Sequence, residues 1–349
     1  MSSMNNIVSV DQKRLLSMMG LCFKANQPLF SWGSPGIGKS DLHRAFTASV
    51  KGVICDVRLA QYDAVDIRGL PDSRDNTTIW HPPSTLPLAG NPGWPTDRPI
   101  VLFLDEMMQA APAVQSVAFQ LVLEGRIGEH ELMPNVRVFA ASNRETDRAG
   151  VQKMLLPLAN RFMHVNLEPS LEGWKDWALA AGVNPAIVGY LSFRPDMLDQ
   201  FEQAIKSGTK AFPTPRVWAK LSQLLEHTRD DYDLMQMTIA AALGEAVGTE
   251  FGAFMRSAHK LPSWDQMMEK PDSIKLPSEP DMNYALVSLM ANRVRPDTAE
   301  PCITIAERLP EEYAVMWMAD TCRRAPDLVI QSPALLQYQT EMHKFIHGS

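Results

Sequence analysis

The sequence predicts an α/β fold, a parallel sheet flanked by helices, followed by an all-helical region. Two observations lead to this prediction. Short apolar runs alternate with helical patterns over the first 170 residues, and the strand signal disappears after Pro169. At 349 residues the chain is long enough for two or three domains. We expect an α/β domain at residues 1–169, a helical domain at 170–259, a linker at 260–281 and a small helical C-terminal unit at 282–349.

Five apolar runs in the first region predict buried strands, because they are short and rich in branched or aromatic side chains. They are Pro28–Trp32, Val53–Leu59, Ile100–Leu104, Val136–Ala141 and Phe162–Leu167. Helical patterns lie between them at Ser40–Val50, Ala113–Leu123 and, for a short helix, near Val151–Leu156. Strands that alternate with helices indicate a parallel sheet covered on both faces.

The connection from Gly69 to Pro99 differs from the rest of this region. It contains seven prolines, too many for a helix, and a loop of this length inside a compact domain is usually functional. Trp80 and Trp94 lie in it. Two interpretations stay open: the two rings are exposed and grip a partner, or they pack against their own domain.

After Pro169 apolar residues recur at spacings of three and four, which predicts helices. The expected helices of the second domain are Leu171–Ala181, Ala186–Tyr190, Met197–Lys206, Arg216–His227 and Tyr232–Phe254. Four prolines and many charges between Lys260 and Asp281 indicate the linker. The C-terminal unit is expected to contain helices at Asn283–Asn292, Ile303–Glu307, Glu311–Cys322 and Pro333–Phe345.

The composition excludes several classes of protein. Hydrophobic residues make up 45% and charged residues 21%, which is ordinary for a globular chain. No apolar run approaches the roughly 20 residues needed to span a bilayer, and the N-terminus has no signal-peptide pattern. The four cysteines are far apart, so neither a zinc site nor a disulfide framework is indicated, and we expect a cytoplasmic protein. A net charge of −7 argues against bulk electrostatic coating of nucleic acid.

The segment Gly33–Ser40 matches the phosphate-binding pattern G-x-x-x-x-G-K-[ST] between an expected strand and an expected helix. Glycines let the backbone N–H groups turn toward phosphate, and the helix N-terminus adds its dipole. Lys39 would reach the β- and γ-phosphates, and the Ser40 hydroxyl would bind Mg²⁺. The alternative is a glycine-rich turn with an exposed lysine. The residues expected around the nucleotide are Gly33, Ser34, Pro35, Gly36, Ile37, Gly38, Lys39, Ser40 and Asp41.

Two acids, Asp105 and Glu106, follow the apolar strand that begins at Ile100. Acids at the carboxyl end of a strand lie where open α/β sheets bind their ligands. Asp105 can hold Mg²⁺ through water, and Glu106 can orient and deprotonate an attacking water. The alternative is that the two acids only solvate a strand end.

Asn143 follows the next apolar strand, Val136–Ala141, at the same expected edge. If the two strands are neighbours, Asn143 lies near the γ-phosphate and can hydrogen-bond both water and phosphate. An asparagine that only caps a strand-to-loop turn is the alternative.

Two arginines complete the set of candidate residues. Arg161 precedes the last expected strand, and Arg216 lies at a helix start after Phe212–Pro215. A cation at a helix N-terminus is disfavoured by the dipole, which indicates an external anionic partner for Arg216, and the planar guanidinium suits phosphate oxygens. For each arginine, pairing with a surface carboxylate is the alternative.

Taken in this order, the elements resemble those of the AAA+ ATPases, and within them the MoxR-type group. The match rests on GSPGIGKS (33–40) as Walker A, VLFLDE (101–106) as Walker B, FAASN (139–143) as sensor 1 and PTPR (213–216) at sensor 2. Asp66–Gly69 with the proline-rich connection is similar to the family's insert in the second helix, and Glu124–Pro134 to its hairpin before sensor 1. The resemblance covers roughly residues 10 to 255.

The resemblance implies an ATP-hydrolysing motor that assembles as a ring, a hexamer by analogy, and remodels or activates a partner protein. A von Willebrand factor A-type protein is the partner that the MoxR group suggests. Mg-ATP would lie between subunits, held by Lys39, Ser40 and Asp105. Glu106 and Asn143 would act on the water, Arg161 would act on the nucleotide of a neighbouring subunit, and Arg216 would link the helical lid to the nucleotide.

The chain departs from the family after sensor 1, where members often have a proline and this sequence has Arg144–Arg148. Arg144 and Arg148 are therefore alternatives to Arg161 as the trans-acting arginine. Two other functions stay open. A motor or loader acting on nucleic acid is disfavoured by the acidic balance and by the lack of an appended helix-turn-helix or zinc finger. A nucleotide-gated scaffold with little turnover is disfavoured by the intact Glu106.

Overall fold

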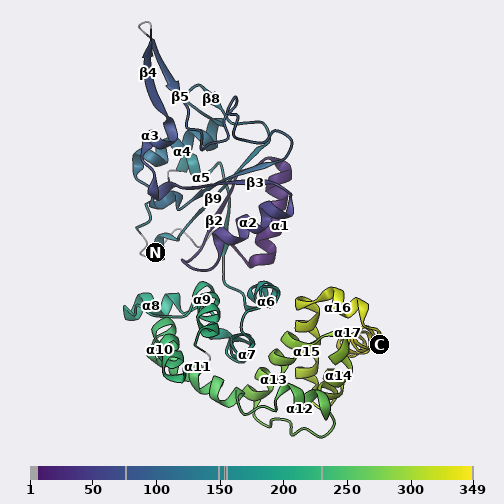
Figure 1. Ribbon diagram of the computed structural model, residues 1–349. Helices are drawn as coiled ribbons and strands as arrows, with labels where there is room; N and C mark the ends of the chain where they lie inside the picture. Colours follow the sequence, from purple (N-terminus) through teal and green to yellow (C-terminus); the bar gives the residue numbers. More distant parts are fainter. Residues whose placement is uncertain are drawn as a thin grey trace. The chain divides into compact units, whose positions relative to one another are not determined.

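The computed structural model describes residues 7–74, 77–147, 150–152, 154, 156–228 and 231–347. The chain divides into two compact parts, residues 1–168 (unit 1) and residues 169–349 (unit 2). The β-sheets lie in unit 1, and unit 2 is helical over its described residues (Figure 1). The predicted order, an α/β region followed by a helical region, is confirmed.

Unit 1 is built on a six-stranded sheet in which every neighbouring pair is parallel. The strand order is β1 (Val8–Val10), β10 (Met163–Leu167), β2 (Leu29–Trp32), β9 (Val136–Ser142), β6 (Ile100–Asp105) and β3 (Val53–Arg58). Five of these strands coincide with the five predicted apolar runs, which are confirmed. β1 has no counterpart among the predictions, because a strand of three residues is too short to show a pattern.

Helices cover both faces of this sheet, as Figure 1 shows: α1 (Gln12–Ala25) and α2 (Lys39–Ser49) on one face, and α3 (Ala64–Arg68), α4 (Pro112–Glu124) and α5 (Leu156–Ala159) on the other. Alternate residues of β6 enter the two cores: Val101 and Phe103 pack with α1 and α2, and Leu102 and Leu104 with α3 and α4. The predicted α2 and α4 are confirmed. Burial on both faces explains why β6 is apolar throughout.

Two helices of unit 1 differ from the prediction. α1 was not expected, although Asp11 is a readable N-cap whose side chain accepts from the Arg14 N–H. The short helix expected near Val151–Leu156 is instead α5, which starts at Leu156. Pro157 explains the shift, because proline suits the first turn of a helix and not its interior.

Two β-hairpins extend from unit 1. β4 (Leu70–Arg74) and β5 (Thr77–His81) form an antiparallel pair that projects away from the main sheet (Figure 1). The expectation of a loop from Gly69 to Pro99 is wrong for this part, since Pro71 is tolerated on the edge of a two-stranded sheet. Residues 82–99 contain only an isolated bridge at Leu88. β7 (Arg126–Ile127) and β8 (His130–Glu131) confirm the hairpin expected at Glu124–Pro134.

The helices of unit 2 agree broadly with the predicted pattern. They are α6 (Leu171–Ala180), α7 (Pro185–Phe193), α8 (Phe201–Ser207), α9 (Pro215–Glu226), α10 (Tyr232–Leu243), α11 (Glu245–Ala258), α12 (Trp264–Glu269), α13 (Pro280–Arg293), α14 (Ala299–Glu307), α15 (Glu311–Arg324), α16 (Pro326–Gln331) and α17 (Pro333–His347). The single helix expected at Tyr232–Phe254 is two helices, because Gly244 takes a φ of 81° between α10 and α11. α8 begins at Phe201, later than expected.

The segment expected as a linker, residues 260–281, contains α12, and Met267 of α12 is fully buried. Met267 belongs to a core shared by α12 to α17, while a second core is shared by α6, α7 and α9 to α11. α13 packs along α7 and so joins the two cores. Ser263 caps the N-terminus of α12, where its hydroxyl accepts from the Gln266 N–H. This capping residue is a sequence signal for a helix, but the prolines around it favoured the prediction of a linker.

Charged side chains also connect distant helices of unit 2. Lys175 of α6 lies 2.8 Å from Asp320 of α15, and both side chains are buried. Arg323 of α15 bonds Asp320 and also pairs with Glu172 and Asp176 of α6. This network fixes the contact between α6 and α15.

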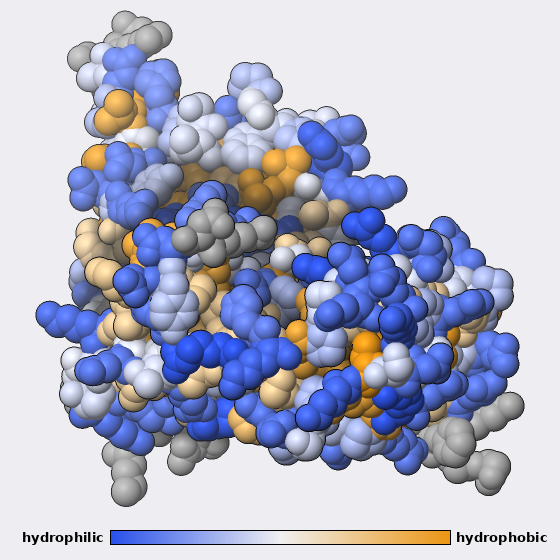
Figure 2. All heavy atoms as spheres, turned by 60° about the horizontal axis from the view of Figure 1, so that its bottom comes forward, coloured by the Kyte–Doolittle hydropathy of each residue, from blue (hydrophilic) through white to orange (hydrophobic). Residues whose placement is uncertain are grey.

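Large apolar side chains are concentrated in these cores. The face drawn in Figure 2 is mainly hydrophilic, with small hydrophobic patches between polar residues. Within the described residues, no helix is both long enough and apolar enough to cross a bilayer.

Candidate active site

The loop from Gly33 to Gly38 connects β2 to α2 and is shaped by its glycines. Gly36 and Gly38 have φ angles of 85° and 95°, a region in which a side chain would strain the backbone by about 1 kcal/mol or more. Gly38 is the N-cap residue of α2 and has no side chain with which to cap the first turn. The N–H groups of that turn therefore face the loop without a side-chain cap from residue 38, which suits an anion.

Lys39, the first residue of α2, folds back over this loop. Its ammonium group donates to Gly33 O at 2.6 Å, to Ser34 O at 3.0 Å and to Asn143 Oδ1 at 3.0 Å. The residue is only 8% exposed. The alternative of a turn with an exposed lysine is thus wrong, and Lys39 and Asn143 lie together as the sequence predicted.

Ser40 and Asp105 meet at the end of β6. The Ser40 hydroxyl donates to Asp105 Oδ2 at 2.7 Å, while Asp105 Oδ1 accepts from the Glu106 N–H at 2.9 Å. Asp105 is 6% exposed, and Glu106 is half-buried. Oxygen ligands are those that Mg²⁺ prefers, so this pair fits a magnesium ion.

Glu106 has an unusual backbone. Its φ of 54° and ψ of 32° lie in the left-handed region, where few non-glycine residues are found. Glu106 leads into a 3₁₀ turn, Met107–Gln109, in which the Gln109 N–H donates to Glu106 O at 3.0 Å. Backbone outliers of this kind cluster at active sites, which supports a functional role for Glu106.

β9 brings Asn143 to the same edge, because β9 pairs with β2 on one side and with β6 on the other. The carboxyl ends of three adjacent parallel strands therefore carry the loop, Asn143 and the two acids. Ser142, the last residue of β9, donates its hydroxyl proton to Gln109 Oε1 at 2.8 Å. Gln109 lies outside every motif, and Ser142, although it is part of the FAASN segment (139–143), was assigned no role, so sequence reasoning missed this contact.

His43 lies one turn along α2 from Lys39 and is fully buried. Its Nδ1 is 2.9 Å from Lys39 O, and its ring stacks on Phe103 with 4.1 Å between centroids. Burial lowers the pKa of His43 to about 4, and the positive charge of Lys39 contributes to this shift. His43 is thus a neutral core residue beneath the loop at physiological pH.

The arginines are placed differently from the residues at the strand ends. Arg161 is exposed in the turn before β10, and within the described part of the chain its side chain forms no hydrogen bond or ion pair. Arg144 is half-buried and bonds the buried Asp147 through Nε at 3.1 Å. Arg148 lies outside the described residues. Arg216 is exposed in the first turn of α9, which belongs to unit 2.

The two tryptophans of the proline-rich connection contact their own domain. Trp94 donates from Nε1 to Ser84 O at 3.2 Å and packs against the core of unit 1. The ring of Trp80 lies 5.0 Å below the guanidinium of Arg68, and its carbonyl oxygen is 2.9 Å from His130 Nε2. Of the two interpretations left open, the structure favours packing against the domain.

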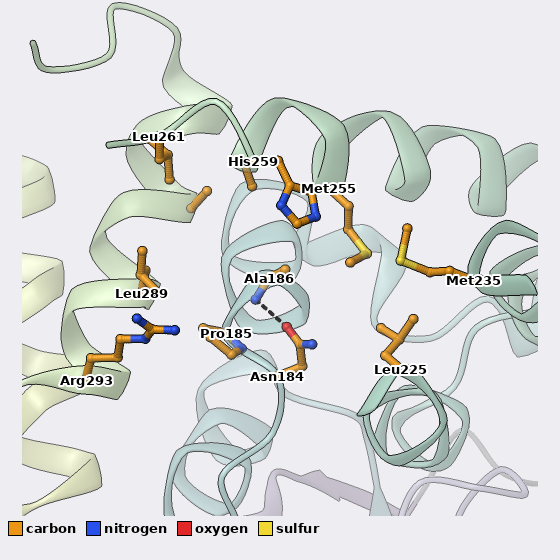
Figure 3. A pocket seen from close by; sticks show the side chains of 12 residues that line it. Asn184, Pro185, Ala186, Leu225, Met235, Met255, His259, Leu261, Leu289 and Arg293 are labelled. Carbon is orange, nitrogen blue, oxygen red and sulfur yellow. Dashed lines mark hydrogen bonds between the residues drawn. The ribbon is translucent and has the colours of Figure 1, made fainter. Parts of the chain in front are cut away.

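Unit 2 has a hollow of about 520 Å³ between α7, α11 and α13 (Figure 3). Its walls include Met235, Met255 and Leu289, and Arg293 and His259 stand beside them. Among the described residues that line it, none carries a carboxylate, a hydroxyl or a thiol. The strand ends of unit 1, where catalytic groups converge, are therefore the better candidate for an active site.

Comparison with known proteins does not place the chain in a family. No protein-family profile and no curated protein matches the sequence. Among solved structures, a Cytophaga hutchinsonii protein proposed to be an ATPase is similar at 15% identity over 50% of this chain, with a TM-score of 0.37. The chain spans about half, 52%, of that protein.

Two further structures give similar values. The Thermotoga maritima RuvB Holliday junction branch migration motor is 14% identical over 75% of both chains, with a TM-score of 0.38. NtrX from Brucella abortus in complex with ADP is 13% identical over 95% of this chain and 68% of its own, with a TM-score of 0.34. These values are too low to support a function, which has to come from the geometry of the site.

Proposed function

We propose that the chain is an ATP-hydrolysing motor of the AAA+ type, with Mg-ATP bound at residues 33–40. The observation that carries the proposal is the meeting of Lys39, Asn143 and the Ser40–Asp105 pair at the carboxyl ends of three adjacent parallel strands. A loop that only stabilises the fold does not need a cation, a hydroxyl, a carboxylate and an amide together beside its glycines. A loop that binds phosphate and Mg²⁺ does need these groups.

The site fits a nucleoside triphosphate together with Mg²⁺. Phosphate oxygens can replace the loop oxygens and Asn143 Oδ1 as acceptors for Lys39, and the N-terminus of α2 favours the negative charge. Ser40 Oγ and Asp105 Oδ2 are 2.7 Å apart, close to the about 2.9 Å between adjacent oxygens of octahedral Mg²⁺. One cation can therefore reach both, directly or through a water. Bound there, Mg²⁺ would neutralise phosphate charge.

The residues of this chain supply the remaining steps. Lys39 neutralises charge on the β- and γ-phosphates, and Asn143 orients the attacking water. Glu106 accepts a proton from that water as its oxygen attacks the γ-phosphorus, and the bond to the β–γ bridging oxygen breaks. ADP and inorganic phosphate are the products. In the left-handed conformation Glu106 stands at the exit of β6 and is partly open to solvent.

The finer part of the proposal is a MoxR-type ring, a hexamer by analogy, that remodels a partner protein. The β4–β5 and β7–β8 hairpins lie in the segments similar to that group's insert and hairpin, which supports it. Arg161 is exposed, so it is available to the nucleotide of a neighbouring subunit. A head-to-tail interface repeats this contact at every junction. Arg216 would bind the nucleotide from the helical lid, and a von Willebrand factor A-type protein would be the partner.

Turnover and nucleotide affinity of Glu106→Gln test the proposal. The substitution removes the base and leaves Lys39, Ser40 and Asp105, so ATP affinity should stay within about twofold while kcat falls by about 10²–10⁴-fold. Glu129→Gln, an exposed acid in the β7–β8 turn, is the matched control and should hydrolyse ATP at the wild-type rate. A Glu106→Gln protein with wild-type turnover would exclude Glu106 as the base.

Mixing experiments test the ring. Arg161→Ala should bind ATP and hydrolyse it slowly. An excess of Glu106→Gln chains should restore activity, because the intact pocket of an Arg161→Ala chain can then receive Arg161 from a neighbouring Glu106→Gln chain. Specific activity of the wild type should also rise with protein concentration through the assembly range. Absence of rescue, with activity independent of concentration, would contradict the trans-acting arginine.

A further inference from the structure

Over the residues that the structure describes, one side-chain hydrogen bond joins the turn after Glu106 to the neighbouring strand β9. Ser142 ends β9, and its hydroxyl donates to Gln109 Oε1 at 2.8 Å. Ser142 is 1% exposed, so water does not compete freely for this bond. Gln109 is the last residue of the 3₁₀ turn that follows Glu106, and its own N–H donates to Glu106 O at 3.0 Å. Gln109 is therefore bonded to Glu106 through its backbone and to β9 through its side chain.

The backbone of Glu106 needs such a restraint. A non-glycine residue in the left-handed region is less stable than in its ordinary conformations by about 1–2 kcal/mol, and it stays there only when neighbouring contacts impose it. Before Glu106, Asp105 Oδ1 holds its N–H at 2.9 Å. After Glu106, Met107 and Met108 are fully buried, and Met108 O accepts from the Gln152 N–H at 2.8 Å. Within the described residues, the Gln109 side chain adds the only side-chain bond between this turn and β9.

We propose that Gln109 and Ser142 are positioning residues that hold the backbone of Glu106 in its left-handed conformation. The role rests on the proposed function, since Glu106 is the base only if the site hydrolyses ATP. In this proposal the two residues act through the backbone of the turn and not through a contact with the nucleotide. Asn143 follows Ser142 directly and accepts from Lys39, so the end of β9 fixes both the Lys39 side and the Glu106 side of the site.

Four variants separate positioning from general stability. Ser142→Ala and Gln109→Met each delete the bond with little change of volume, whereas Ser142→Thr and Gln109→Glu retain a hydroxyl donor and a carboxyl acceptor. The deletions should lower kcat about tenfold with KM and ATP affinity unchanged, because a small displacement of the base affects the chemical step. The conservative variants should retain most activity. Combining both deletions should lower kcat no further than one does, as expected for partners in one bond.

Ser116→Ala is the matched control. It removes a hydroxyl from an exposed position on α4 in the same unit, where Ser116 bonds Pro112 O, and it should leave kcat unchanged. Equal losses in kcat and ATP affinity, or additive losses in the double variant, would overturn the proposal, because they would indicate general disruption of the site.

Hydrogen exchange in the nucleotide-free protein gives a readout that does not depend on turnover. The Gln109 amide, which is bonded to Glu106 O, should exchange at least about tenfold faster in Ser142→Ala and Gln109→Met, and at the wild-type rate in Ser142→Thr. Amides of β9 should not change. Unaltered exchange at Gln109 would overturn the proposal. A wild type that does not hydrolyse ATP would refute the proposed function, yet exchange at Gln109 would still decide whether the pair holds the turn.

Discussion

Units 1 and 2 each bury a lysine, and the two ammonium groups are satisfied in different ways. Lys175 of unit 2 lies 2.8 Å from the fully buried carboxylate of Asp320, so a formal positive charge meets a formal negative charge. Lys39 of unit 1 donates to two loop carbonyls and to the amide oxygen of Asn143, which are neutral acceptors. The first arrangement fixes one helix to another. The second holds an ammonium among oxygens that a phosphate can replace.

Position within the fold explains the difference. Lys175 and Asp320 lie on α6 and α15, two helices that pack against each other inside unit 2. Lys39 lies at a helix N-terminus beside a glycine loop, at the edge of a parallel sheet where the backbone itself favours anions. A buried lysine is therefore a functional signal only when its surroundings are built for a ligand, and substitutions at Asp320 and at Lys39 test this distinction.

The largest expected effect is on the stability of unit 2. Asp320→Asn keeps the shape of the side chain but leaves Lys175 buried without its carboxylate, so the free energy of unfolding should fall by about 3–5 kcal/mol. Denaturant unfolding monitored by circular dichroism measures it. Arg323 also loses its charged contact with Asp320 but keeps its pairs with Glu172 and Asp176, so Lys175 is the group left without a carboxylate.

The double variant Lys175→Met with Asp320→Leu is the control for this prediction. Apolar residues in place of both charges should restore most of the lost stability, since burial of the pair is itself costly. If Asp320→Asn unfolds at the same denaturant concentration as the wild type, the ion pair does not fix α6 to α15.

Lys39→Met should show the opposite behaviour. Nucleotide affinity should fall by about 100-fold, equivalent to about 2.7 kcal/mol, while the free energy of unfolding changes by less than about 1 kcal/mol. Isothermal titration with ATP and denaturant unfolding measure the two quantities. Lys24→Met removes the same charge from an exposed position on α1 and should change neither. A large loss of stability with unchanged ATP affinity would make Lys39 a structural lysine like Lys175.

The same contrast separates what the sequence predicts from what it does not. The strands, the loop at residues 33–40 and the meeting of Lys39 with Asn143 follow from local patterns, because parallel strands place their carboxyl ends at one edge. The Lys175–Asp320 pair joins residues far apart in the chain, and helical periodicity shows only that a face is buried, not which charge meets it.

Two further features of unit 1 could not be predicted from the sequence, for other reasons. The β4–β5 hairpin was obscured by the prolines of its segment, which exclude a helix but not an edge strand. The left-handed backbone of Glu106 has no sequence signal, since glutamate is not among the residue types enriched in that region, which are glycine, asparagine, aspartate and histidine. Local backbone conformation and pairing between distant residues are therefore the features that could not be predicted from the sequence.

The smallest expected effect concerns His43, a buried group that links the loop to the core of unit 1. Burial lowers its pKa to about 4, below the ordinary value near 6.5, so the unfolded chain binds the proton more tightly than the folded one. The contribution of neutral His43 to the free energy of unfolding is fully present above about pH 6.5 and is lost as the pH falls toward 4. Between about pH 7 and 5.5 the free energy of unfolding should therefore fall by about 1 kcal/mol.

His43→Phe keeps the stacking on Phe103 without a titrating group and should flatten this pH dependence. His227→Gln, at an exposed helix end, should leave the dependence unchanged. Denaturant unfolding of the three proteins across this pH range measures the slopes. Equal slopes for wild type and His43→Phe would mean that the proton does not destabilise the helix that carries Lys39.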